Sequence, residues 1–211
     1  MTSRRRLAAL MLAAAVSCDA AAYLAQVGPG LLRYAEMRFG SDGRLRLVRW
    51  QRDEQAIGVR APPPEALLAA VNALANGIPA ANDGEHWGQS EYWATPAEFV
   101  ASNGGDCEDY AIAKYFALRA AGVPAAQLRL IYVRALSSQR IENHMVLAFY
   151  PAAGADPLIL DNLDGRMRPA SERPDLVPVF SFNDDDLNRS GVPMIRRWRD
   201  LQQRIQSERE L

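Results

Sequence analysis

The chain has 211 residues, a length that predicts one domain with at most a short terminal extension. Apolar residues make up 49% of the chain, which is enough to build a buried core. The formal net charge is −1, so the chain lacks the positive excess typical of nucleic-acid binding, and we expect no nucleic-acid partner. Only His86 and His144 could serve chemistry that needs an imidazole.

The N-terminal segment, residues 1–22, has the pattern of an export signal. Three arginines at 4–6 precede a short apolar stretch, and the alanines at 20–22 fit a cleavage site. Cys18 leaves a lipoprotein signal open as a second interpretation, and an uncleaved anchor is a third. After cleavage at a plain signal, Cys107 would be the one remaining cysteine. A lone thiol in an oxidising compartment favours a catalytic role over an inert one.

The first half of the chain carries one strand candidate and two predicted helices. Residues 44–50 alternate polar and apolar side chains, which favours a strand or an amphipathic edge. Residues 65–78 repeat apolar side chains at helical spacing and predict a helix. Thr95, Pro96 and Glu98 form a capping-box pattern, which predicts a short helix ending near Asn103 and Gly104.

The second half is predicted to hold a helix followed by strands. The helix begins at Cys107 and ends near Ala121, because Gly122 and Pro124 stop it. Four strand candidates follow: residues 128–135, 144–150, 157–161 and 177–182. Consecutive strands with short loops predict an antiparallel sheet in an α+β domain. The charged tail from residue 193 has a helical pattern and predicts a peripheral helix.

The turn that precedes the Cys107 helix combines two opposing electrostatic effects. A thiol at a helix N-terminus faces unpaired N–H groups and the positive end of the helix dipole, both of which favour thiolate. Asp106, Glu108 and Asp109 crowd the same turn and would raise the pKa of the thiol. We therefore expect a positive group nearby, either a histidine or a metal ion. Glu108 and Asp109 can also be read as ordinary first-turn acids.

Two further residues complete a candidate catalytic triad. His144 begins one predicted strand, and Asp161 ends the next. If these strands pair antiparallel, both residues meet at one edge of the sheet, where a packed helix can also place Cys107. In a Cys-His-Asp triad the imidazole takes the thiol proton and the carboxylate orients the imidazole. The alternatives stay open at this point: His144 as a satisfied strand-end histidine, and Asp161 as a turn-forming residue.

Several blocks of sequence resemble one known family. The blocks begin at Gly105-Asp106-Cys107-Glu108-Asp109-Tyr110, at Asn143-His144-Met145 and at Leu160-Asp161-Asn162-Leu163. Further matching blocks are Trp87-Gly88, Tyr92-Trp93-Ala94-Thr95-Pro96, Pro169-Ala170-Ser171 and Ser181-Phe182-Asn183. In this order, over roughly residues 30–190, they resemble the bacterial transglutaminase-like cysteine peptidases, the LapG family. The resemblance implies a papain/transglutaminase-like fold, with the nucleophile's helix packed on an antiparallel sheet.

The resemblance also implies an activity, a metal and partners. It implies a periplasmic, calcium-dependent cysteine endopeptidase with Cys107, His144 and Asp161 as its triad. Its calcium ligands would include Asp106 and Glu108, with Asp109 as a further candidate. Such enzymes cut the N-terminal region of a large surface adhesin at an Ala-Ala site and so promote biofilm dispersal. An inner-membrane receptor for cyclic di-GMP sequesters them.

Two other functions remain open for the same residues. The triad could pass its acyl group to an amine, as protein-crosslinking transglutaminases do, or the chain could be a non-catalytic calcium-responsive binding module. In every case we divide the chain into a signal peptide (1–22), a transglutaminase-like domain (23–192) and a charged C-terminal helix (193–211).

Overall fold

The structure is a computed structural model that describes residues 27–59, 64–137, 140–189 and 191–211. The predicted signal peptide, with Cys18, lies outside the described residues. Among the helices in the described ranges, none combines the length and the apolar character needed to cross a membrane.

The described residues form helices and one antiparallel sheet, as expected for an α+β domain. The helices are α1 (Pro29–Val59), α2 (Pro64–Asn76), α3 (Asp83–His86), α4 (Pro96–Ser102), α5 (Cys107–Ala120) and α6 (Pro193–Arg209). The strands are β1 (Leu128–Leu136), β2 (Ile141–Phe149), β3 (Leu158–Leu160), β4 (Arg168–Pro169) and β5 (Leu176–Phe182). Their order in the sheet is β4-β3-β2-β1-β5, and all neighbours are antiparallel.

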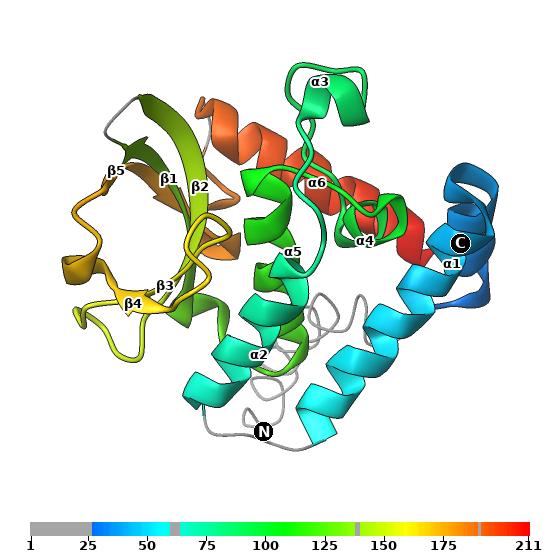
Figure 1. Cartoon of the computed structure of the whole chain (residues 1–211), viewed down its shortest axis with the longest axis horizontal. Helices are drawn as coiled ribbons and strands as arrows, with labels where there is room; N and C mark the ends of the chain where they lie inside the picture. Colours follow the sequence, from blue (N-terminus) through cyan, green and yellow to red (C-terminus); the bar gives the residue numbers. More distant parts are fainter. Residues whose placement is uncertain (1–26, 60–63, 138–139, 190) are drawn as a thin grey trace, which may run out of the picture.

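The sheet and the helices form two sides of the molecule. Figure 1 shows the strands gathered at one side, with α5 standing next to them and with α4 and α1 further away. Helix α5 contacts both β2 and β1, so the helix that begins at Cys107 lies directly against the centre of the sheet. The main core fills the space between α5 and the sheet. Every second residue of β1 and β2, such as Leu128 and Leu130 or Met145 and Leu147, points toward α5 and contributes to this core.

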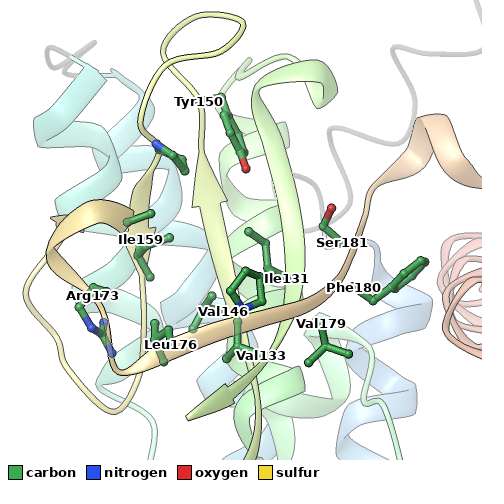
Figure 2. Close-up of a pocket in the computed structure, with 13 residues that line it drawn as sticks. Ile131, Val133, Val146, Tyr150, Ile159, Arg173, Leu176, Val179, Phe180 and Ser181 are labelled. Carbon is green, nitrogen blue, oxygen red and sulfur yellow. The ribbon is translucent and has the colours of Figure 1, made fainter. Parts of the chain in front are cut away.

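The opposite face of the sheet carries a second, smaller apolar cluster. It consists of Ile131, Val133, Val146, Ala148 and Ile159. A cavity of about 360 Å³ opens beside these side chains, between β3, β1 and β5, and Figure 2 shows Arg173 at one end of it.

Residues 44–50 do not form the predicted strand. They lie within α1, a long helical segment with a break at Gly40, where φ is +74°. The helix buries Leu47 and Trp50, which are one turn apart, and leaves Leu45 and Val48 exposed. The short alternation of arginine and leucine is therefore compatible with a helix as well as a strand. Packing of one helix face against the core decides for the helix.

The C-terminal helix is part of the core, so the prediction of a peripheral helix was wrong. On α6, the side chains of Ile195, Trp198, Leu201 and Ile205 are buried. The Trp198 ring lies 5.4 Å from that of Tyr115 and 5.7 Å from that of Phe182, measured between centroids. The apolar stripe was correctly predicted to lie on one face of a helix, and the structure shows that this face packs into the core.

The turn before α5 is shaped by close backbone approaches. Asn103 ends α4 in the left-handed conformation, with φ of 61°. A Cβ at Gly104 would collide with the His86 ring, and one at Gly105 would collide with Phe99 and Asp109. Only glycine fits in these two places, which explains the Gly-Gly pair before the cysteine. At the other end of α4, the predicted capping box of Thr95 and Glu98 is confirmed.

The pairing of β2 with β3 has the predicted antiparallel sense. Leu147 lies opposite Leu160, so the chain after β3 runs toward the residues of β2 that precede Leu147. His144 is one of these residues, although β2 begins earlier than predicted, at Ile141. The register therefore carries Asp161 to the neighbourhood of His144.

Candidate active site

The cysteine at the start of α5 lies against strand β2. Cys107 is the first residue of the helix, and the backbone N–H of Met145 donates a hydrogen bond to its sulfur. Met145 directly follows His144, so this contact brings the thiol to the part of β2 that carries the imidazole. The thiol itself donates to Glu108 Oε2 at 2.7 Å.

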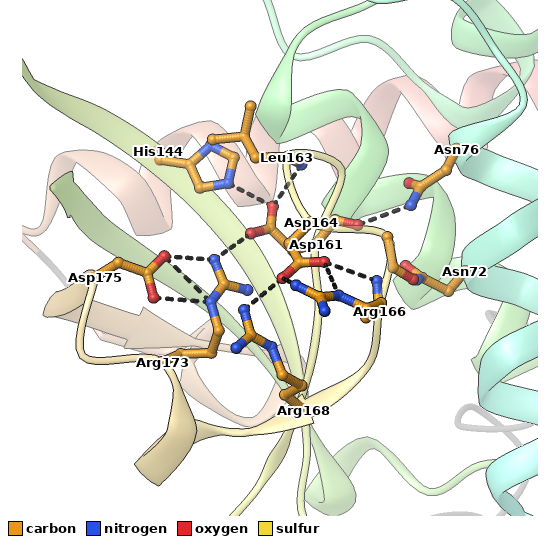
Figure 3. A network of polar contacts seen from close by, with 11 residues as sticks. Asn72, Asn76, His144, Asp161, Leu163, Asp164, Arg166, Arg168, Arg173 and Asp175 are labelled. Atoms are coloured by element: carbon orange, nitrogen blue, oxygen red, sulfur yellow. Dashed lines mark hydrogen bonds and ion pairs between the residues drawn. The ribbon is translucent and has the colours of Figure 1, made fainter. Parts of the chain in front are cut away.

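His144 and Asp161 form a buried pair. His144 Nε2 and Asp161 Oδ1 are 2.7 Å apart, and the two residues are 3% and 1% exposed (Figure 3). With Nε2 engaged by the carboxylate, Nδ1 is the ring nitrogen left to exchange a proton with another group. Asp161 can thus fix both the orientation and the tautomer of His144.

Further donors hold the Asp161 carboxylate in place. The Leu163 N–H donates to Oδ1 at 3.0 Å, and Arg173 Nη2 donates to Oδ2 at 2.8 Å (Figure 3). The Asn76 side chain of α2 donates to the Asp161 backbone oxygen at 2.8 Å. Burial alone would raise the pKa of Asp161, but the hydrogen bond and charge of His144, followed by the Arg173 bond, lower it to about 2.

This pair belongs to a wider set of alternating charges, which we call the Asp161 network. Its members are His144, Asp161, Arg173 and Asp175. Arg166 and Arg168 pair with Asp164, whereas Arg173 bridges Asp161 and Asp175. Each carboxylate in the network therefore has a basic partner.

A second group of acids surrounds the start of α5, and we call it the acidic cluster. It comprises Asp83, Asp106, Glu108 and Asp109. Asp83, Asp106 and Asp109 each offer a carboxylate oxygen within 4.8 Å of the others. A second grouping of the same kind joins Asp106, Cys107 and Glu108.

The oxygens of the acidic cluster suit a hard divalent cation. Asp83 Oδ1 and Asp106 Oδ1 are buried, and neither has a hydrogen-bond partner among the described residues. Asp109 already accepts the backbone N–H of Ala94 at 2.7 Å and that of Asp106 at 3.3 Å, which ties the loop before α4 to the helix. Unpartnered carboxylate oxygens in a group of closely spaced acids are the type of ligand that a calcium ion prefers.

The electrostatics of the cluster are consistent with a missing positive charge. Burial and then the charges of Glu108 and Asp83 raise the pKa of Asp106 to about 8. Burial raises the pKa of Asp83 and of Asp109, and neighbouring acids add to the effect. Burial, followed by the charge of Glu108, also raises the pKa of the Cys107 thiol. In the protein alone these groups therefore resist ionisation.

The structure brings the residues selected from the sequence into one region. Cys107 contacts the backbone next to His144, and His144 contacts Asp161. Asp106 and Glu108 each place a carboxylate oxygen within 4.8 Å of the Cys107 sulfur, and Asp109 follows in the first turn of α5. The edge at which these elements meet is the one predicted from antiparallel pairing.

Two residues of this region were missed in the sequence. Asp83 stands in a stretch rich in Asp and Gly, and nothing in its spacing connects it to a turn more than twenty residues later. Arg173 follows a short 3-10 turn and had no motif to mark it. The only local signal for Arg173 was an acidic residue, Asp175, two positions later. An arginine and an aspartate at this spacing are common on protein surfaces and do not indicate a functional site.

Comparisons with known proteins agree with this arrangement. The family model for bacterial transglutaminase-like cysteine proteinases (BTLCP) matches residues 51–174. Among solved structures, Legionella pneumophila LapG is 37% identical, with a TM-score of 0.70, over 83% of this chain and 95% of that one. Calcium-bound LapG from the same organism is 36% identical, with a TM-score of 0.69, over 83% and 97% of the two chains.

An EGTA-treated form of the same protein is 35% identical, with a TM-score of 0.68, over 83% of this chain and 95% of that one. No curated protein sequence matches the chain.

Proposed function

The chain belongs to the bacterial transglutaminase-like cysteine proteinases, and on that premise we propose that it is a calcium-dependent endopeptidase with Cys107, His144 and Asp161 as its triad. One observation carries the assignment of the triad. His144 Nε2 lies 2.7 Å from Asp161 Oδ1, while the next N–H along the strand donates to the Cys107 sulfur. A thiol, an imidazole and a buried carboxylate in this order suit acyl transfer to a thiolate.

The proposed reaction follows from these positions. His144 Nδ1 accepts the Cys107 thiol proton, and the thiolate attacks the peptide carbonyl carbon to form a tetrahedral oxyanion. The Cys107 N–H, one of the unpaired donors at the start of α5, is a candidate to stabilise that oxyanion. The imidazolium then protonates the leaving amine, which leaves a thioester. Water, deprotonated by His144, hydrolyses the thioester and restores the thiol.

Calcium is the proposed cofactor of the acidic cluster. Legionella pneumophila LapG has been solved in calcium-bound and EGTA-treated forms. In this chain Asp83, Asp106 and Asp109 each place a carboxylate oxygen within 4.8 Å of the others, and one oxygen each of Asp83 and Asp106 has no hydrogen-bond partner among the described residues. Asp83, Asp106 and Asp109 would hold the ion, with Glu108 as a further candidate. A bound calcium ion supplies positive charge beside the nucleophile, which offsets the repulsion between these acids and a thiolate.

The substrate, location and regulator are also proposals. We propose that the enzyme acts in the periplasm on the N-terminal region of a large surface adhesin, at an Ala-Ala site, and so releases cells from a biofilm. An inner-membrane cyclic di-GMP receptor would be its inhibitory partner. The support is the resemblance to the LapG family and the export-signal pattern of residues 1–22.

The test uses the purified protein and an N-terminal adhesin fragment. We expect calcium-dependent cleavage that EGTA or Cys107→Ala abolishes. Mass spectrometry of the products distinguishes hydrolysis from transfer to an added amine, which is the outcome expected of a crosslinking acyltransferase. Cleavage that persists in Cys107→Ala would refute the proposed nucleophile.

A further inference from the structure

Arg173 connects the candidate triad to a surface carboxylate. Its side chain is 3% exposed, and its Nη2 donates to Asp161 Oδ2 at 2.8 Å and to Asp175 Oδ2 at 2.8 Å. Its Nε donates to Asp175 Oδ1 at 2.9 Å. The guanidinium therefore forms a two-point fork on Asp175 while one nitrogen reaches inward to Asp161 (Figure 3).

The backbone on either side of this fork is anchored. The Arg173 N–H donates to Ala170 O at 3.0 Å, and Leu176 N–H donates to Arg173 O at 3.0 Å. The Leu136 N–H at the end of β1 donates to Asp175 O at 2.7 Å. The hydrogen bond from Leu136 thus fixes the Asp175 backbone to the sheet that carries His144. Asp175 in turn holds the Arg173 side chain in position relative to that sheet.

Both oxygens of the Asp161 side chain are consequently occupied. Oδ1 contacts His144 and accepts the Leu163 N–H, whereas Oδ2 receives Arg173. If Arg173 were absent, the carboxylate could rotate about its Cβ–Cγ bond, and Asp161 would be a buried anion with weaker compensation. Either change would loosen the alignment of the imidazole with the thiol.

We propose that Arg173 is a positioning residue of the catalytic site: it holds Asp161 ionised and correctly rotated, and through Asp161 it aligns His144 with Cys107. The proposal rests on the proposed triad. Arg173 does not contact Cys107 and acts through Asp161, so its loss should slow the chemical step and leave substrate binding unchanged. A displacement of about 1 Å in a reacting group can cost about 10²-fold in rate.

The loop that follows Asp161 supplies a matched control. Arg166 pairs with Asp164 at 3.1 Å in the loop that follows Asp161, and its side chain is 78% exposed. A general weakening of this loop would affect both arginines. A positioning role belongs to Arg173 alone.

The cavity on the outer face of the sheet allows a further test. Arg173 lines this cavity together with Val133, Leu176 and other apolar side chains (Figure 2). In Arg173→Ala, a guanidinium ion from solvent therefore has a route to the vacated position. Urea has a similar shape and no charge, so it serves as the matched control for rescue.

The experiment compares the wild type with Arg173→Gln, Arg173→Lys, Arg173→Ala and Arg166→Gln at saturating calcium. The measurements are kcat and KM on the adhesin fragment and the rate of Cys107 alkylation by iodoacetamide, with circular dichroism to confirm folding. We expect kcat to fall about 10²-fold in Arg173→Gln and about tenfold in Arg173→Lys, whose single amine cannot reproduce the fork. KM should stay within twofold, and alkylation should slow in parallel with kcat.

Millimolar guanidinium, but not urea, should restore part of the kcat of Arg173→Ala, and Arg166→Gln should match the wild type. A folded Arg173→Gln with wild-type kcat overturns the proposal. If that variant does not fold, wild-type kcat in Arg173→Lys overturns it instead. Failure of the wild type itself to cleave the fragment or to react at Cys107 would refute the proposed function, which is a different outcome.

Discussion

The acidic cluster and the Asp161 network place the same residue type in opposite surroundings on the two sides of the thiol. Around Asp106 the neighbours are other acids, and the pKa of its carboxyl rises to about 8. Around Asp161 the neighbours are His144 and Arg173, and the pKa falls to about 2 despite burial. Among the described residues no ion pair joins a basic side chain to the acidic cluster, whereas Asp161 pairs with both His144 and Arg173.

This difference suggests a division of labour. The Asp161 network can keep an imidazole oriented with the chain's own residues alone. The acidic cluster can favour the thiolate only when a cation is added from solution, so activity becomes conditional on that cation. Mutations in the two regions should consequently produce different defects, and the following predictions, from the largest expected effect to the smallest, test that separation.

Asp161→Ala should lower kcat by about 10³-fold, because the imidazole loses the group that sets its tautomer and orientation. The calcium concentration that gives half-maximal activity, or half of the thermal stabilisation by calcium, should not change, since Asp161 lies outside the acidic cluster. Cleavage kinetics and calcium titration check the two halves of this prediction. A changed calcium response would mean that the two regions are coupled.

Calcium should raise the melting temperature of the wild-type protein. At a hundredfold excess over Kd, ligand binding stabilises a fold by about 2.7 kcal/mol, which corresponds to roughly 5–10 °C in a chain of this size. Magnesium should do less at equal concentration, because it demands a smaller, octahedral site. Asp106→Asn should lose most of the effect. Thermal scans that show an equal shift in the variant would place the ion elsewhere.

The stability contributed by Asp161 should depend on pH in a defined direction. The folded pKa of Asp161, about 2, lies below the ordinary value of 3.8 for a free aspartate. Its contribution to stability is therefore fully present above pH 3.8 and disappears as the pH falls through the folded pKa. The gap in unfolding free energy between wild type and Asp161→Asn should therefore narrow by up to about 2 kcal/mol between pH 5 and pH 2.5. Urea denaturation at each pH measures the gap, and a constant gap would contradict the prediction.

Asp83→Asn should raise the calcium concentration needed for half-maximal activity by about tenfold or more, because the site loses one charged ligand. At saturating calcium its kcat should approach that of the wild type. Glu85→Gln is the matched control, since Glu85 lies on the same short helix and is exposed. A kcat that stays low at saturating calcium would show that Asp83 also serves the chemistry.

Parts of this picture could be predicted from local pattern. The capping box at Thr95, the start of α5 at Cys107 and its end before Gly122 each depend on residues close together in the chain. Elements whose structure depends on packing against distant parts of the chain were harder to predict from the sequence. Residues 44–50 alternated like a strand and formed a helix, and the charged α6 proved to bury Trp198 in the core.

The sequence by itself determined the chemistry available to this protein: one cysteine at a helix start, one strand histidine, one aspartate after the next strand and acids around the thiol. These are local facts of residue type and spacing, and antiparallel pairing of adjacent strands was enough to predict that His144 and Asp161 meet. Only the tertiary structure decided which distant groups complete each site. Asp83 joins Asp106 through the packing of a loop, and Arg173 reaches Asp161 through a turn anchored on β1. Such contacts depend on how the elements pack and leave no periodic signal in the chain.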